Sequence, residues 1–136
     1  MQDKDMNTDN TLKNGERLNF RAGEYAENLS TQLRKGLLSY CVLLICRNEV
    51  YTSEILRGLK EAEVAVAEGT IYPLLARLQK DDLLSYQWRE SEQGPPRKYY
   101  VVTEYGQAVR QRLASSIKEL NSSITKLERS KNERNK

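Results

Sequence analysis

A Gly-Pro turn between two aromatic-rich runs, directly behind two short amphipathic segments, is the feature that most limits how this chain can fold. The runs read "LLSYQWRE" and "RKYYVV", and the turn between them holds Gly94, Pro95 and Pro96. Aromatic and β-branched residues on both sides of such a turn predict a β-hairpin. The chain is therefore expected to be mainly helical with one small β-hairpin.

The two segments before the hairpin carry apolar residues at helical spacing. In the first, "YTSEILRGLKEA", Thr52 or Ser53 is expected to cap the helix, because a hydroxyl accepts a hydrogen bond from a free backbone N–H. A short connector, residues 63–67, leads to the second, "EGTIYPLLARLQK", residues 68–80. Two short helices around a tight connector predict a helix-turn-helix, and a hairpin directly behind it is the wing of a winged helix. The residues expected to face inward are Ile55, Leu56, Leu59, Ile71, Leu74, Leu75 and Leu78.

The start of the second helix has an unusual composition, with Gly69, Thr70, Tyr72 and Pro73 close together. The N–H groups of a helix's first turn have no partner inside the helix, so a proline placed early loses little. Gly69 would let another surface approach the backbone closely, and the two hydroxyls lie beside the free N–H groups. This pattern is typical of a helix end that meets phosphates and base edges. The alternative is that Tyr72 is a core aromatic and Thr70 a simple cap.

The region before the helix-turn-helix divides into two parts. Residues 1–28 are polar with a net charge of −2, from four basic and six acidic residues, and are expected to form a flexible arm or a loose extra helix. Residues 29–47 predict a helix that is apolar nearly all round, and packing against a second subunit is one way to bury such a helix. Its apolar residues include Leu29, Leu33, Leu37, Leu38, Cys41, Val42, Leu43, Leu44 and Ile45.

A long helix is predicted behind the hairpin, over residues 104–130, with Thr103 as its cap. Its apolar residues form a stripe resembling a heptad repeat: Val109, Leu113, Ile117, Leu120, Ile124 and Leu127. Such a helix extends on the order of 37 Å, more than a small winged domain needs for its own core. We expect it to pair with a second chain; the alternative is an amphipathic helix packed within the same chain. Residues 131–136 form a basic tail that is expected to fray.

Composition excludes several classes of protein. The 136 residues suffice for one domain with a modest core, so oligomerisation is expected. There is no histidine and no catalytic motif, so an enzyme is poorly supported, and no catalytic residue, metal or cofactor is expected. Cys41 and Cys46 are expected to be buried thiols of a reducing compartment. The longest apolar run, residues 36–46, is about half the ~20 residues of a membrane span, and we expect a cytoplasmic protein without membrane contact.

Two motifs, "GTIYPLLARL" and "GPPRKYYVVTEYG", resemble the signatures of the PadR family of bacterial transcriptional regulators, in the same order and spacing. The resemblance covers roughly residues 33–113. It implies a winged helix-turn-helix with a long C-terminal dimerisation helix, over residues 29–103 and 104–130. It further implies a dimeric repressor of a pseudo-palindromic DNA operator, released by a small aromatic or cationic effector.

The resemblance also assigns roles to residues. The expected DNA contacts are Thr70, Tyr72, Pro73, Arg77, Gly94, Arg97, Lys98 and Tyr100. The expected dimer interface comprises Leu37, Leu44, Leu113, Ile117, Leu120 and Ile124. Tyr40, Leu44 and Trp88 are weak effector candidates, and for Trp88 packing in the core or on the strand is the stronger interpretation. Of Tyr99 and Tyr100, one should pack on the core while the other faces the DNA.

Three positions depart from the family pattern, and the charge leaves an alternative open. Ala67 replaces a capping Ser, at a cost of roughly 1 kcal/mol, while Thr52 and Asp82 replace Gly, which suggests that Asp82 has a left-handed backbone. Residues 68–103 hold five basic and five acidic residues, so this region is formally neutral. A winged-helix module that binds protein instead of DNA therefore remains the alternative, unless Arg34, Lys35, Arg57 or the tail adds positive charge.

Overall fold

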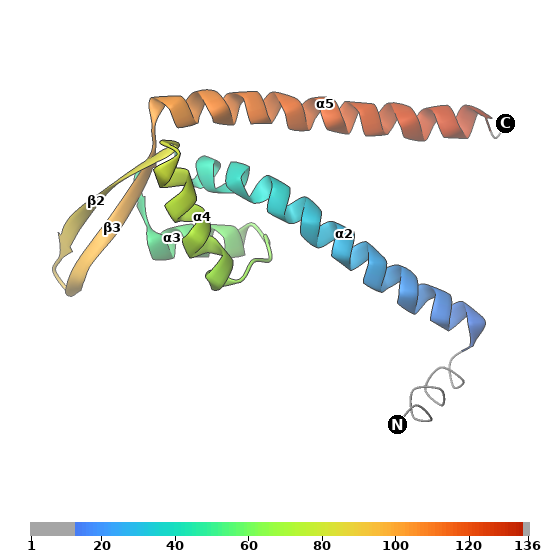
Figure 1. The fold of residues 1–136 in the computed structure, drawn as a ribbon, viewed down its shortest axis with the longest axis horizontal. Helices are drawn as coiled ribbons and strands as arrows, with labels where there is room; N and C mark the ends of the chain where they lie inside the picture. Colours follow the sequence, from blue (N-terminus) through green and yellow to red (C-terminus); the bar gives the residue numbers. More distant parts are fainter. Residues whose placement is uncertain (1–12, 135–136) are drawn as a thin grey trace. The chain divides into compact units, whose positions relative to one another are not determined.

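The computed structural model describes residues 13–134 of the chain (Figure 1). Its elements in chain order are α2 (Asn14–Ile45), β1 (Val50–Tyr51), α3 (Thr52–Glu61), α4 (Glu68–Lys80), β2 (Leu84–Ser91), β3 (Gly94–Val102) and α5 (Glu104–Arg134). The chain divides between residues 37 and 38 into two units. The second unit contains the end of α2 and every later element, and it carries the candidate site.

The core of the second unit is one apolar cluster to which α2, α3, α4 and the sheet all contribute. From the two central helices it takes Ile55, Leu59, Ile71, Leu74, Leu75 and Leu78, as their helical spacing predicts. The end of α2 adds Leu38, Val42 and Leu43, and Cys46 follows directly after the helix. The sheet adds Leu84, Tyr100 and Val102. The predicted helix-turn-helix and hairpin are therefore confirmed as one packed body.

The sheet has three antiparallel strands in the order β1-β3-β2. In its register, Tyr86 lies opposite Tyr100 and Trp88 lies opposite Lys98. Because side chains alternate across a strand, these four residues share one face of the sheet with Leu84 and Val102. That face begins in the core and continues outward along the hairpin, which Figure 1 shows as the paired β2 and β3.

Both central helices end in the same hydrogen-bonded turn. At the end of α3, the N–H of Val64 donates to the Leu59 carbonyl (2.8 Å), and Glu63 has a left-handed backbone with φ of 61°. At the end of α4, the N–H of Leu83 donates to the Leu78 carbonyl (2.8 Å), and Asp82 has φ of 64°. This is the Schellman motif, whose left-handed residue is usually glycine. The left-handed conformation expected of Asp82 is confirmed.

Two predicted boundaries and one predicted cap were wrong. Helix α2 begins at Asn14 instead of residue 29, so residues 14–28, expected as a flexible arm or loose helix, continue the same helix; residues 1–12 lie outside the described residues. Helix α5 continues to Arg134, into the tail that was expected to fray. Neither Thr52 nor Ser53 caps α3, because the helix already begins at Thr52. Instead, the Glu54 carboxylate accepts a hydrogen bond from the N–H of Tyr51 (3.0 Å).

The start of α5 is fastened to the turn between α4 and β2. As predicted, Thr103 caps the helix: its hydroxyl accepts a hydrogen bond from the N–H of Gly106 (2.9 Å). The same hydroxyl donates to the Asp82 carbonyl (2.6 Å). Gly106 is buried against this turn, where it lies next to the Leu83 carbonyl and the Val102 side chain. The first turns of α5 therefore belong to the winged domain.

The apolar stripe of α5 changes its surroundings along the helix. Val109 and Leu113 pack against the core, as the alternative of an intramolecular helix expects. Further along, Leu120, Ile124 and Leu127 are more than half exposed. The other predicted interface residues, Leu37, Leu44 and Ile117, are half-buried. None of the described helices is both long enough and apolar enough to span a membrane.

Candidate nucleic-acid interface

Helix α4 presents one buried face and one exposed face. Its apolar residues point into the core, while the opposite face carries Gly69, Thr70, Tyr72, Pro73, Ala76, Arg77 and Lys80, all exposed. Tyr72 is 52% exposed, so the alternative that it is a core aromatic was wrong. Ala67 precedes the helix without a side-chain hydrogen bond, as its departure from the family pattern predicts. The start of α4 is thus uncapped and open to a ligand.

The position of Pro73 differs from the prediction. Helix α4 begins at Glu68, so Pro73 is its sixth residue and lies beyond the turn whose N–H groups lack partners. In a regular helix this residue would donate to the carbonyl of Gly69, and proline has no N–H to donate. The Gly69 carbonyl therefore loses its usual partner. A Cβ added at Gly69 would meet no atom of the chain within 4 Å, so the backbone is open to solvent here.

Lys98 lies among three aromatic rings on the face of the hairpin that continues from the core. Its Nζ is 4.1 Å from the ring centroid of Tyr86, 5.2 Å from that of Tyr100 and 5.9 Å from that of Trp88. Cation–π contacts of this kind contribute about 0.5–1 kcal/mol each at exposed sites. They hold the ammonium group in place beside the strand before any ligand arrives.

Arg97 and Arg89 lie on the other face of the hairpin, and both contact tyrosines. The Arg97 guanidinium is 4.5 Å from the ring centroid of Tyr51, which meets the Tyr99 ring edge-on at 5.5 Å. Arg89 lies 5.3 Å from the Tyr99 centroid and forms an ion pair with Glu49 (2.6 Å). Arg89 is therefore partly neutralised, whereas Arg97 keeps its charge for a ligand.

A groove of about 550 Å³ joins α4 to the hairpin. It is lined by Tyr51, Thr52, Ser53, Tyr72, Ala76, Trp88, Arg97, Lys98 and Tyr100. Of the predicted DNA contacts, it brings together Tyr72, Arg97, Lys98 and Tyr100. Thr70, Pro73 and Arg77 lie on the exposed face of α4, and Gly94 is exposed at the start of β3. Tyr51, Thr52, Ser53 and Ala76 were not predicted as part of the site. Tyr51 belongs to β1, and a strand of two residues shows no periodicity.

The tyrosine pair and the tryptophan have distinct positions. Tyr100 is 5% exposed and belongs to the core, so little of it is free for the DNA contact predicted for it, while Tyr99 is half-buried on the other face. Trp88 is 62% exposed, so packing in the core was wrong for it, whereas on the strand it lies opposite Lys98 of β3, as the other half of that expectation allows. Tyr40 and Leu44, the other effector candidates, are half-buried on α2.

The two thiols are free, and both have a raised pKa. Burial raises the pKa of Cys46 from its ordinary value of 9.0 to about 12. Burial also raises the pKa of Cys41, although a backbone hydrogen bond partly opposes the shift. Thiols with a raised pKa are poor nucleophiles and poor metal ligands. In the range 13–134, no three cysteine or carboxylate side chains gather where they could hold a metal ion.

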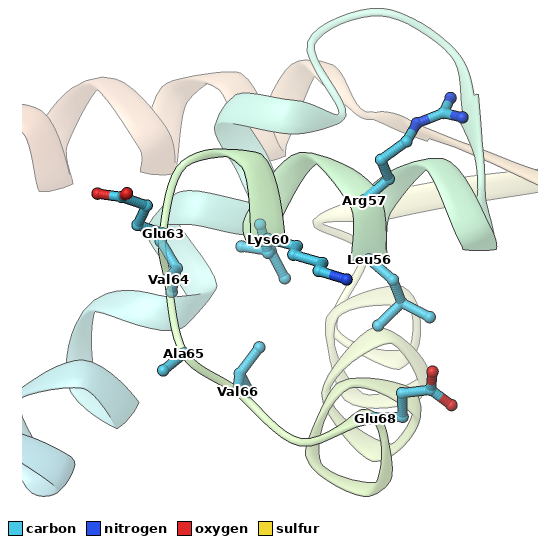
Figure 2. A pocket seen from close by; sticks show the side chains of 9 residues that line it. Leu56, Arg57, Lys60, Glu63, Val64, Ala65, Val66 and Glu68 are labelled. Atoms are coloured by element: carbon cyan, nitrogen blue, oxygen red, sulfur yellow. The ribbon is translucent and has the colours of Figure 1, made fainter.

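A second hollow lies under the connector between α3 and α4 (Figure 2). Leu56, Leu59, Val64, Ala65 and Val66 provide its apolar part. Its charged lining consists of Arg57, Lys60, Glu63 and Glu68, with two charges of each sign. Figure 2 shows Glu63 and Glu68 at opposite ends of the connector. The balanced charge favours neither an anion nor a cation, so this hollow is a weaker candidate than the groove.

The sequence matches a known family. The pattern of the transcriptional regulator PadR-like family covers residues 42–112, just over half of the chain. No curated protein sequence matches the chain.

Several solved structures are similar to this one. A PadR-like transcription factor from Bacteroides fragilis is 51% identical, with 74% of this chain and 98% of that one covered and a TM-score of 0.63. A PadR-like transcriptional regulator from Bacillus cereus is 36% identical over 71% and 95% of the two chains, with a TM-score of 0.62. A PadR family transcriptional regulator from Eggerthella lenta is 27% identical over 79% and 96%, with a TM-score of 0.73.

Proposed function

This chain belongs to the PadR-like family of transcriptional regulators, and on that premise we propose that α4 and the hairpin grip one DNA duplex together. In this arrangement, the exposed start of α4 enters the major groove and the hairpin lies along the neighbouring backbone. Thr70, Tyr72 and Pro73 are the proposed contacts of the helix, with Arg77 at the backbone. Arg97, Lys98 and the turn at Gly94 are those of the wing.

One observation carries this proposal: the groove connects α4 to the two wing cations through a continuous lining. Tyr72 and Ala76 come from the helix, and Arg97 and Lys98 come from β3. The aromatic contacts of Arg97 and Lys98 hold both charges at this lining. Cations fixed beside a recognition helix suit a phosphate backbone, because most protein–DNA hydrogen bonds go to phosphate and sugar. The edge of Tyr100 that lines the groove adds a minor contact.

The same proposal includes a dimer. The exposed half of the α5 stripe, with Leu120 and Ile124, has no partner among the described residues of the chain. A second copy would cover it, with Leu37, Leu44, Leu113 and Ile117 completing the interface. Two recognition helices about 34 Å apart would then read a pseudo-palindromic operator.

Repression and effector release complete the proposed function, and they rest on family resemblance alone. The effector would be a small aromatic or cationic molecule bound near Tyr40 and Leu44 at the dimer interface. Trp88, the third candidate, lies on the wing. A bacterial regulator of this kind acts on the chromosome, and we therefore place it in the cytoplasm.

DNA binding is tested by a gel shift with the full chain and a duplex taken from upstream of its own gene. The double variant Tyr72→Ala, Arg97→Ala should weaken binding at least tenfold, since one good base or backbone contact contributes about 1–3 kcal/mol. The matched control is Tyr105→Ala, Arg112→Ala, which removes an exposed aromatic and an exposed cation from α5. If the wild-type chain does not shift the duplex, DNA binding is wrong and the alternative of a winged-helix module that binds protein replaces it.

Salt dependence separates a phosphate contact from a structural role. Removing one cation from a phosphate lowers the slope of log K against log salt by about 1. We expect that loss for Lys98→Ala and no change of slope for Lys118→Ala, whose cation is exposed on the polar side of α5. An unchanged slope in Lys98→Ala would remove Lys98 from the interface.

A further inference from the structure

Trp88 is the only tryptophan of the chain, and its indole is 62% exposed on β2. Burial of an aromatic side chain of this size is strongly favourable, so an indole left exposed is available for a contact. The exposed aromatics of α2 and α5 lie elsewhere on the chain. Trp88 alone of the exposed aromatics on the sheet lines the groove that also holds Tyr72 of α4.

The register of the hairpin determines which way Trp88 faces. It lies opposite Lys98 and two residues from Tyr86, which lies opposite the buried Tyr100. These four side chains therefore share one face, and that face packs on the core at its inner end. Trp88 occupies the outer end, past the point where the core stops.

The groove also places a positive charge beside the indole. Lys98 Nζ lies 5.9 Å from the ring centroid of Trp88 and 4.1 Å from that of Tyr86. An indole offers an apolar ring and a single N–H donor. Together, ring, donor and ammonium match the parts of a deoxyribose-phosphate unit: an apolar sugar face and an anionic oxygen.

We propose that Trp88 is a DNA-backbone contact, in which the indole ring packs on a deoxyribose and its Nε1–H donates to the adjoining phosphate. This inference rests on the proposed DNA binding and adds a residue to it. Lys98 neutralises the same phosphate, and Tyr72 flanks the strand from the side of α4. Such a contact carries no base information, so it adds affinity equally for all sequences.

Fluorescence provides the direct test, because all tryptophan emission comes from Trp88. The full wild-type chain is titrated with acrylamide, a neutral quencher, with and without the upstream duplex. Free protein should be quenched readily, since the indole is exposed, and the duplex should protect it. A random-sequence duplex at low salt should protect it as well, because the contact is to the backbone.

Two variants separate the ring from its N–H. Trp88→Ala should weaken binding about tenfold, as expected for the loss of one good contact, and Trp88→Phe should fall between this variant and the wild type. Neither should change the salt slope, because no charge is removed. Tyr105→Ala, which removes an aromatic that is 61% exposed at the start of α5, is the matched control and should bind like the wild type. Circular dichroism of each variant checks that it unfolds at the wild-type temperature.

The outcomes distinguish the Trp88 contact from the proposed DNA binding on which it rests. A wild-type chain that shifts the duplex while Trp88 stays fully quenchable, and a Trp88→Ala variant that binds undiminished, would overturn the contact and leave DNA binding intact. A wild-type chain that binds neither duplex would overturn both. The contact is supported if the duplex protects Trp88 from acrylamide and DNA affinity falls from the wild type through Trp88→Phe to Trp88→Ala.

Discussion

Gly106 lies directly against the backbone carbonyl of Leu83, so that a side chain at position 106 has no room. A Cβ there would collide with the Leu83 oxygen and lie 2.6 Å from Cγ2 of Val102. The close approach allows α5 to start immediately behind β3. The glycine is needed for space and not for its backbone freedom, because its φ is not positive.

Gly106→Ala should therefore destabilise the fold by about 1–3 kcal/mol, the range of overpacked cores. Urea unfolding followed by circular dichroism measures this change. Gly36→Ala on α2 is the control: a Cβ there meets nothing within 4 Å, so stability should stay the same or rise. Equal stability of both variants would mean that the turn at Leu83 yields easily.

Gly69→Ala should separate stability from DNA binding. Alanine favours a helix by roughly 0.5–1 kcal/mol over glycine, and nothing in the chain obstructs the new methyl group. The free energy of unfolding should hold or increase. If the backbone here meets DNA closely, affinity in the gel shift should fall about tenfold, as for one lost contact. Undiminished affinity would show that Gly69 is not at the interface.

Replacing either left-handed residue with glycine should stabilise the domain. A residue with a side chain costs about 1–2 kcal/mol in the left-handed region, and glycine avoids this cost. Glycine also loses more backbone entropy on folding, which offsets part of the gain. Asp82→Gly and Glu63→Gly should each raise the free energy of unfolding by about 1 kcal/mol or somewhat less. Asp81→Gly, with an ordinary φ of −87° one residue earlier, should lower it. A loss of stability in Asp82→Gly would indicate that the Asp side chain stabilises the turn.

Alkaline pH should weaken the fold through Cys46. Its pKa is about 12 in the folded chain and 9.0 ordinarily, so between these values only the unfolded chain releases the proton. Ionisation then favours unfolding, and the stability present below pH 9.0 is lost as pH rises toward 12, by up to about 1.4 kcal/mol per pH unit. Urea unfolding at two pH values on either side of 9.0 measures this slope. Cys46→Ala should flatten the slope and Cys41→Ala should keep most of it; a wild-type slope in Cys46→Ala would contradict the assignment.

The sequence predicted those parts of the fold that show a period. The inward residues of α3 and α4, such as Ile55 and Leu75, follow helical spacing and were placed correctly. The hairpin followed from its turn residues. The beginning of α2 was missed, because residues 14–28 carry no regular apolar stripe and the structure leaves all of them except Arg17 exposed.

The parts of the site that depend on strand register and tertiary contact could not be predicted from the sequence. Tyr99 and Tyr100 alternate across a strand, and only pairing with β2 and β1 decides which ring enters the core. Trp88 could have been placed by counting outward from Tyr86 along the same face. The crowding at Gly106 arises from a residue 23 positions earlier, Leu83, so no local pattern signals it.

The double hydrogen bond of Thr103, to Asp82 and from Gly106, ties the first turn of α5 to the turn that ends α4. With 31 residues the helix is about 46 Å long, so a tilt of about five degrees displaces its far end by about 4 Å. The same tilt would move atoms next to Thr103 by well under an ångström. Any tilt of α5 about Thr103 would therefore be large at the far end of the helix and small at the turn that ends α4.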